Sequence, residues 1–171
     1  MKYWVIADTH LGHDQLLEYA GRPTCFEDTI LENVRKTVQS DGVLIHLGDV
    51  CIGNDAMWHE HLLSSSGKKW LIKGNHDSKS TSWYLAHGWD FVGDSLTLKM
   101  FGHEILFSHY PIVAGTYTLN IHGHFHNSDH RRHEPEFAAI KNDKQVLVMM
   151  EHHYMPQDLR KIVGSATGVR V

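Results

Sequence analysis

Acidic, amide and histidine side chains that could bind metal ions occur in five short clusters of the sequence, each directly after an apolar run. The clusters are Asp8-Thr9-His10, Gly48-Asp49, Gly74-Asn75-His76-Asp77, Ser108-His109-Tyr110-Pro111 and Gly123-His124-Phe125-His126. In α/β proteins, such ligands collect at the carboxyl ends of strands. The clusters therefore predict one site that is built from distant parts of the chain.

Two spacings within the clusters, D-x-H at 8–10 and H-x-H at 124–126, have a geometric interpretation. In an extended strand, residues two apart point to the same face, so each pair could reach one site together. Carboxylate, imidazole and amide ligands suit divalent ions such as Mn²⁺, Fe²⁺, Zn²⁺, Co²⁺ or Ni²⁺. Seven ligands are too many for one tetrahedral ion but can divide between two ions that share a carboxylate. Paired ions roughly 3.5–4 Å apart can hold a water nucleophile and a phosphoryl oxygen.

Each cluster alone would also fit an ordinary turn or helix cap, so the metal-site interpretation depends on the joint order of all five. His46, two residues before Gly48, is interpreted as a buried structural histidine rather than an eighth ligand. Histidines outside the clusters, among them His59, are expected to be solvated or locally hydrogen-bonded. Cys51 is interpreted as a small packing residue, and two cysteines are too few for a disulfide framework.

Apolar periodicity predicts alternating strands and helices in the first half of the chain. Strands are expected at 3–7, 43–47 and 70–72, and helices at 28–39, with Asp28 as a candidate N-cap, 56–63 and 82–86. Later runs predict a hairpin of strands at 95–100 and 104–108, then strands at 119–121 and 146–150. This order predicts an α/β fold with a two-sheet β-sandwich flanked by helices, in α/β/β/α layers.

The length of 171 residues and the hydrophobic content of 42% predict a single globular domain over 1–171. The formal net charge is -4, and without a long basic run the composition gives no argument for binding bulk nucleic acid. The run at 130–133 could attract an anionic substrate, although an exposed loop explains it more simply. The N-terminal stretch MKYWVIADTH is too short in apolar residues for a signal peptide or membrane span, so we expect a cytoplasmic protein.

The ordered set D-x-H, G-D, G-N-H-D, H and G-H-x-H resembles the calcineurin-like metallophosphoesterase superfamily over about residues 4–126. The segments ADTHLGH, GRP and LIHLGD are similar to a branch of short bacterial and phage phosphoesterases, and the less specific segment VMMEHHYMPQDL is similar to the end of that branch. The resemblance implies two divalent ions, with Mn²⁺ foremost. It implies that one ion binds Asp8, His10 and His126, that the other binds Asn75, His109 and His124, and that Asp49 bridges the two.

The resemblance also implies that His76 faces the scissile phosphate, where it stabilises charge or protonates the leaving oxygen, while Asp77 orients its ring. His13 and Arg22 are candidate substrate contacts, with Arg22 as an anion clamp, and plain surface roles are their alternative. The implied reaction is hydrolysis of a phosphodiester or phosphomonoester by a metal-activated water. A small phosphodiester or nucleotide-like substrate is favoured over a phosphoprotein.

Two other functions fit parts of the sequence. Some members of the superfamily are non-catalytic scaffolds for protein interactions, as in the retromer coat, but such scaffolds often lose the catalytic histidine or metal ligands, and here none is missing. A nuclease subunit is disfavoured by the neutral to acidic composition and by the lack of an appended DNA-binding region. A homo-oligomer is compatible with the sequence.

Overall fold

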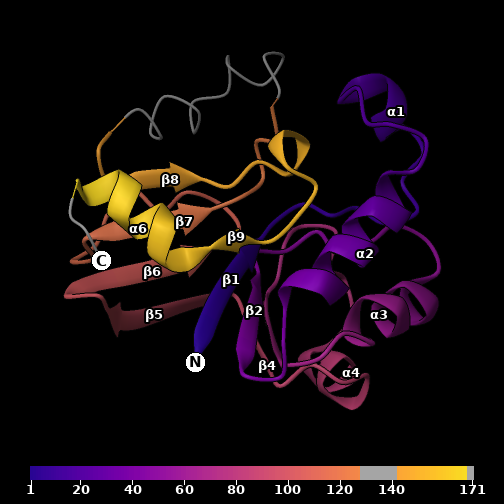
Figure 1. Ribbon diagram of the computed structural model, residues 1–171, viewed down its shortest axis with the longest axis horizontal. Coiled ribbons are helices and arrows are strands. Elements are labelled where there is room, and N and C mark those ends of the chain that lie inside the picture. The colour runs from indigo at the N-terminus through magenta and orange to yellow at the C-terminus, as the bar shows by residue number, and fades with distance from the viewer. Residues whose placement is uncertain (128–141, 169–171) are drawn as a thin grey trace.

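The computed structural model describes residues 1–127 and 142–168, and the run at 130–133 lies outside them. The elements are β1 (Lys2–Ile6), α1 (Leu16–Tyr19), α2 (Phe26–Thr37), β2 (Gly42–His46), α3 (Asp55–Leu63), β3 (Lys68–Ile72), α4 (Thr81–Ala86), β4 (Phe91–Gly93), β5 (Ser95–Met100), β6 (His103–Ser108), β7 (Leu119–His122), β8 (Gln145–Leu147), the short 3₁₀ helix η2 (Met150–His152), β9 (Gln157–Asp158) and α6 (Leu159–Thr167). Figure 1 shows two sheets with α2, α3 and α4 on one side of the molecule and α6 on the other.

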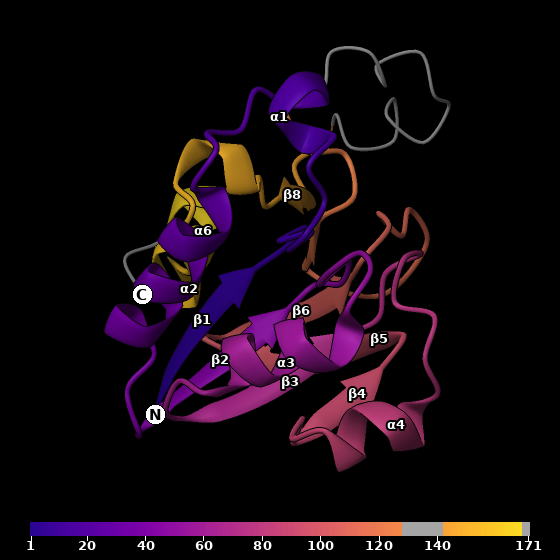
Figure 2. The same ribbon diagram turned by 90° about the vertical axis from the view of Figure 1, so that its right-hand side faces the viewer.

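The first sheet has the strand order β4-β3-β2-β1-β9. Strands β1 to β4 run parallel, and the short β9 pairs antiparallel with β1. Helices connect these parallel strands, as the alternation in the sequence predicted, and Figure 2 shows α2 and α3 in front of the sheet. Because β1, β2 and β3 are parallel, their carboxyl ends lie at the same edge.

The second sheet has the order β5-β6-β7-β8. The predicted hairpin is confirmed, since β5 and β6 pair antiparallel around Phe101 and Gly102, which both have positive φ. Strands β6, β7 and β8 are parallel, so these described strands do not continue the hairpin pattern. The strand expected at 146–150 ends at Leu147, and η2 follows from Met150.

Alternate residues of the first sheet enter two hydrophobic layers. Leu44 and Leu71 pack with the helices on one face. Val5 and Ile45 pack toward the second sheet, in the same cluster as Phe107. The predicted fold class is confirmed: two mixed sheets are flanked by helices, and the apolar face of α2 is buried against the first sheet.

Several local predictions were wrong or incomplete. Helix α2 begins at Phe26 after an N-cap residue, Cys25, whose side chain makes no capping hydrogen bond, so Asp28 is not the cap. Helix α6 was missed, although Leu159 and Val163 have helical spacing and join the layer between the sheets. Cys51 is buried in the core as predicted, and both cysteines are free. Within 1–127 and 142–168, no helix has the length and apolar character needed to cross a membrane.

Candidate metal centre

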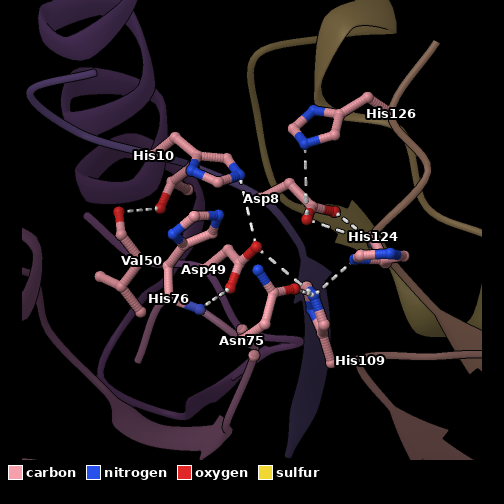
Figure 3. Close-up of polar contacts among 12 residues, drawn as sticks. Asp8, His10, Asp49, Val50, Asn75, His76, His109, His124 and His126 are labelled. Carbon is pink, nitrogen blue, oxygen red and sulfur yellow. Dashed lines mark hydrogen bonds and ion pairs between the residues drawn. The ribbon is translucent and has the colours of Figure 1, made fainter. Parts of the chain in front are cut away.

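The five clusters predicted from the sequence meet at the carboxyl ends of five strands. Each cluster follows one strand, in the order β1, β2, β3, β6 and β7. Figure 3 shows the side chains of these loops directed toward a common centre between the two sheets. The structure brings together all seven residues that the sequence suggested as metal ligands: Asp8, His10, Asp49, Asn75, His109, His124 and His126.

The backbone that carries these side chains is not extended, although the strand interpretation of the spacing required an extended backbone. Strand β1 ends at Ile6 and β7 at His122, so neither D-x-H nor H-x-H is extended. Asp8 (φ 53°), His10 (φ 45°) and His126 (φ 51°) are left-handed. Asp49 (φ 57°) and His124 (φ 74°) are left-handed too. The same-face interpretation of the spacing was therefore wrong. Such conformations are uncommon for residues with a Cβ, and their concentration here is typical of a functional site.

One side of the centre is formed by Asp8, His10 and His126, whose potential ligand atoms lie within 4.8 Å of one another. Nε2 of His126 is 3.8 Å from Oδ1 of Asp8. The rings of His10 and His126 stack with their centroids 5.0 Å apart. Asp8 is held from behind, because its carboxylate accepts a hydrogen bond from the backbone N–H of His124 at 3.0 Å.

The other side of the centre is formed around Nε2 of His109. This atom lies 3.0 Å from Oδ1 of Asn75, 3.1 Å from Nδ1 of His124 and 3.4 Å from Oδ2 of Asp49. Nδ1 of His109 is 2.8 Å from the carbonyl oxygen of Leu47, to which it must donate. The bond fixes the tautomer, so the Nε2 lone pair of a neutral ring faces the other ligand atoms.

Asp49 lies between the two sides. Its Oδ2 is 3.5 Å from Nε2 of His10 and 3.4 Å from Nε2 of His109. Its Oδ1 accepts a hydrogen bond from the backbone N–H of His76 at 2.8 Å. Asp49 is therefore the carboxylate that both sides share.

The electrostatics of the described residues fit bound cations. Buried His10 has no hydrogen-bond partner for either ring nitrogen among these residues. Burial holds its pKa well below the usual range, so the ring is neutral and has a lone pair to offer. Burial also raises the pKa of Asp49 to about 6, with Asp8 adding to the increase and His109 opposing it. A divalent ion would supply the missing positive charge and the missing partner.

Two glycines let the chain approach the carboxylates closely. A Cβ on Gly74 would lie 2.2 Å from Oδ1 of Asp49, and one on Gly123 would lie 2.4 Å from Oδ2 of Asp8. Both distances are far below contact, so any side chain would displace a carboxylate of the centre. The glycines in G-N-H-D and G-H-x-H are thus explained by packing against the site.

His76 and His13 line a hollow of about 170 Å³ that opens beside the centre. His76 is exposed, and its ring centroid is 5.3 Å from that of His10. The ring of His13 is 5.5 Å from that of His10 and 6.5 Å from that of His76. Leu16 and Tyr19 of α1 form an apolar wall of the same hollow. The structure therefore places both histidines where a substrate at the centre could meet them.

Asp77 does not contact the His76 ring in the way that the sequence suggested. Its carboxylate accepts hydrogen bonds from the backbone N–H groups of Asp49 (2.8 Å), Val50 (3.1 Å) and Gly74 (2.8 Å). The proposed orientation of the imidazole by Asp77 is corrected accordingly. Asp77 instead joins the loop after β2 to the loop after β3.

Arg22 is buried rather than exposed to an incoming anion. Its guanidinium donates to the carbonyl oxygens of Asp8 and Thr9, both at 2.7 Å, and to Oε1 of Glu151 at 2.7 Å. The guanidinium faces protein acceptors, so the clamp role is replaced by a structural one. Glu151 was not singled out from the sequence, although it lies in the closing segment VMMEHHYMPQDL.

Glu151 contacts the centre directly. Its Oε1 is 3.0 Å from Nδ1 of His126. Burial alone would raise the pKa of Glu151, but the hydrogen bond and charge of His126 and the charge of Arg22 lower it to about 2. The ionised carboxylate accepts the Nδ1 proton, which leaves Nε2 of His126 facing Asp8.

His46 has the structural role that the sequence predicted. Its Nδ1 accepts from the backbone N–H of Gly48 at 3.1 Å, and its Nε2 lies 2.9 Å from Oγ1 of Thr9, whose hydroxyl donates to the carbonyl of Val50 at 2.7 Å. Burial lowers the pKa of His46 to about 3, which keeps the ring neutral. His46 thus joins the loops after β1 and β2 without facing the ions.

A second hollow of about 300 Å³ also borders the centre at Asn75. It is lined by Lys73, His109 and Tyr110, and the Tyr110 hydroxyl donates to Oδ1 of Asn75 at 3.1 Å. Asn75 lines both hollows. A larger hollow of about 810 Å³ lies along β8, β9 and α6 and contains none of the seven clustered residues.

The two-sheet α/β fold gathers carboxylate, imidazole and amide side chains at its strand ends, and such a mixed set of donors suits divalent metal ions. Residues 1–168 match the family described as calcineurin-like phosphoesterase. The chain belongs to this family, in which phosphoester hydrolysis uses divalent metal ions.

Similar proteins span nearly the whole chain. An uncharacterized protein of Methanocaldococcus jannaschii is 28% identical, with 95% of this chain and 89% of that protein covered. A crystal structure of a protein of unknown function from Aquifex aeolicus shares the fold, with a TM-score of 0.78, 24% identity and coverage of 96% and 98% of the two chains. A nuclease from Pseudomonas putida overlaps only in part, with a TM-score of 0.48, 24% identity and coverage of 72% and 61%.

Proposed function

We propose that this protein hydrolyses phosphoesters with two divalent metal ions held by the seven clustered side chains. Asp8, His10 and His126 would hold one ion, Asn75, His109 and His124 the other, and Asp49 both. The observation that carries the proposal is the position of Oδ2 of Asp49, 3.5 Å from a nitrogen of one group and 3.4 Å from a nitrogen of the other. The mixed donors suit Mn²⁺, Fe²⁺, Zn²⁺, Co²⁺ or Ni²⁺, and the resemblance to the family puts Mn²⁺ first.

The residues would divide the chemical work among them. When bound, paired divalent ions neutralise phosphoryl oxygens and lower the pKa of water. His76 is not used by the two ligand sets and is exposed in the hollow beside Asp49, so its imidazole can donate a hydrogen bond to a phosphoryl oxygen or a proton to the leaving oxygen. His13, at the same hollow, would contact the substrate beyond its phosphate.

A phosphodiester of small-molecule or nucleotide-like kind is the preferred substrate. Two separate hollows border the centre and share Asn75, so each substituent of a diester could occupy one of them. The wall formed by Leu16 and Tyr19 suits an apolar or aromatic substituent on one of them.

Hydrolysis assays with defined substrates test the proposal. Protein freed of metal with a chelator would be supplied with each divalent ion and given bis-p-nitrophenyl phosphate, p-nitrophenyl phosphate or cyclic nucleotides. We expect Mn²⁺-dependent hydrolysis, faster for the diester, and its loss in Asp49→Asn, which keeps the shape of the side chain. Inactivity with every ion would favour a non-catalytic scaffold, and faster hydrolysis of the monoester would contradict the substrate preference.

A further inference from the structure

The Arg22–Glu151 pair joins segments that are far apart in the sequence. Arg22 follows α1 and Glu151 lies in η2, yet their charged groups meet at 2.7 Å with side chains only 0% and 3% exposed. Both Nε and NH2 of Arg22 donate to the same oxygen of Glu151, at 3.1 and 2.7 Å. The His126 ring contacts that oxygen as well.

The remaining contacts of the pair go to two loops of the centre. Arg22 donates to the carbonyl oxygens of Asp8 and Thr9, and these bonds hold the loop in which Asp8 (φ 53°) and His10 (φ 45°) are left-handed. Glu151 holds His126 through Nδ1, which leaves Nε2 directed toward Asp8. The pair therefore fixes both the backbone of one loop and the ring of the other.

Stability alone is a weak explanation for such a pair. Removing two charges from water is costly, and apolar replacements of buried ion pairs are often neutral or stabilising. Here the hydrogen bonds of both charged groups go to each other and to segments that carry Asp8, His10 and His126, while the Arg22 guanidinium also lies over the Phe26 ring, 5.0 Å from its centroid. Of the side chains proposed for the other ion, His109 is held by the bond from its Nδ1 to Leu47 and Asn75 accepts from the Tyr110 hydroxyl, whereas the backbone of His124 donates to the Asp8 carboxylate.

We infer that Arg22 and Glu151 are positioning residues for only one of the two metal ions, the ion bound by Asp8, His10 and His126. The inference rests on the proposed function and deepens it, because it makes the two metal positions unequal. Loss of the pair loosens three ligands of one ion and leaves His109 and Asn75, which hold the other ion, in place. Substitutions that disturb partners behind metal ligands typically weaken metal binding about 10- to 100-fold.

Two variants and a matched control test the inference. Glu151→Gln keeps the size of the side chain but removes its charge, and Arg22→Lys keeps a charge but loses the planar fork that reaches three acceptors. Asn33→Ala is the control: Asn33 of α2 donates to the carbonyl of Tyr154 at 2.9 Å, so it holds the same C-terminal segment without touching the pair. Bound Mn²⁺ is counted by equilibrium dialysis of the full chain, with free Mn²⁺ read from its electron paramagnetic resonance signal.

The expected result is two ions per chain in the wild-type protein and in Asn33→Ala. In Glu151→Gln and Arg22→Lys, one ion binds with wild-type affinity and the other about 10- to 100-fold more weakly. Unchanged affinity for both ions, or equal weakening of both, would overturn the inference. If the wild-type protein binds two ions and hydrolyses diesters but the variants bind Mn²⁺ as tightly as it does, the inference fails and the proposed function stands. A wild-type protein that binds no pair of ions refutes both.

A measurement on the unsubstituted protein decides the matter even if the variants do not fold. Long-range ¹H–¹⁵N spectra of the Zn²⁺-loaded chain report which imidazole nitrogens carry protons. We expect a protonated Nδ1 and a metal-bound Nε2 at His126, as the 3.0 Å contact with Glu151 requires. The opposite tautomer would overturn the inference, because Glu151 would then have no proton to accept.

Discussion

Replacing Gly74 by alanine would place a methyl group against the carboxylate that the two metal positions share. The new Cβ would lie 2.2 Å from Oδ1 of Asp49 and 2.6 Å from its backbone nitrogen, whereas ordinary contact begins at 3.4 Å. Either the new methyl group or the Asp49 residue must therefore move by about 1 Å. The carboxylate has little freedom to retreat, because Oδ1 accepts from the backbone of His76 at 2.8 Å, and the loops are joined by Asp77.

A shift of this size at the shared ligand should affect catalysis strongly. Misplacement by about 1 Å can cost about 100-fold in rate, which corresponds to about 2.7 kcal/mol of transition-state stabilisation. We expect kcat/KM for bis-p-nitrophenyl phosphate to fall by about this factor in Gly74→Ala. Both Mn²⁺ affinities should weaken, because Asp49 lies between both ligand groups.

The assay compares Gly74→Ala with a control, Gly42→Ala. Gly42 lies at the end of β2 that is remote from Asp49. A Cβ on Gly42 would lie 3.1 Å from the carbonyl oxygen of Gln39, and Gly42 is the first residue of β2, whereas Asp49 lies in the loop after the last residue. Gly42→Ala should keep wild-type activity and both Mn²⁺ affinities. Native activity and metal affinity in Gly74→Ala would refute the close packing of the glycine against the shared ligand.

Three further predictions follow from the same contacts. His76→Ala should lower kcat by about 100-fold or more while two Mn²⁺ ions still bind, and loss of metal binding would contradict its assigned role. Burial lowers the pKa of His59 from 6.5 to about 4. As the pH falls between these two values, His59 therefore takes up a proton in the unfolded chain but stays neutral in the native protein. Chemical denaturation should show a drop in the free energy of unfolding between pH 7 and 4 that is up to about 3 kcal/mol larger in the wild-type protein than in His59→Gln. Adding Mn²⁺ at about 100 times its dissociation constant should raise the free energy of unfolding by about 2.7 kcal/mol per ion, whereas Asp49→Asn should show a much smaller increase.

The convergence of the seven side chains could be predicted from the sequence because each of them follows an apolar run. The runs that end at Ile6, His46 and Ile72 form parallel neighbours, and parallel strands bring their carboxyl ends to one edge. The backbone conformation could not be predicted from the sequence, since D-x-H and H-x-H fit an extended strand as well as left-handed turns. Tertiary contacts such as the bonds from Arg22 to the loop carbonyls select the left-handed form.

Glu151 and His59 show why other residues were harder to predict. Glu151 is 129 positions from Arg22 and 25 from His126, so no local pattern links the three residues. His59 was expected to be solvated or locally hydrogen-bonded, yet it is 1% exposed and accepts a hydrogen bond from Nε1 of Trp89 at 2.9 Å, 30 positions away. In contrast, α6 could have been predicted, because Leu159, Ile162, Val163 and Ala166 repeat with helical spacing.

Anomalous diffraction from a crystal grown with excess Mn²⁺ tests the central claim most directly. The claim predicts two manganese peaks about 3.5–4 Å apart, one beside Asp8, His10 and His126 and the other beside Asn75, His109 and His124, with Asp49 bound to both. A single peak, or an occupied site away from Asp49, would contradict it.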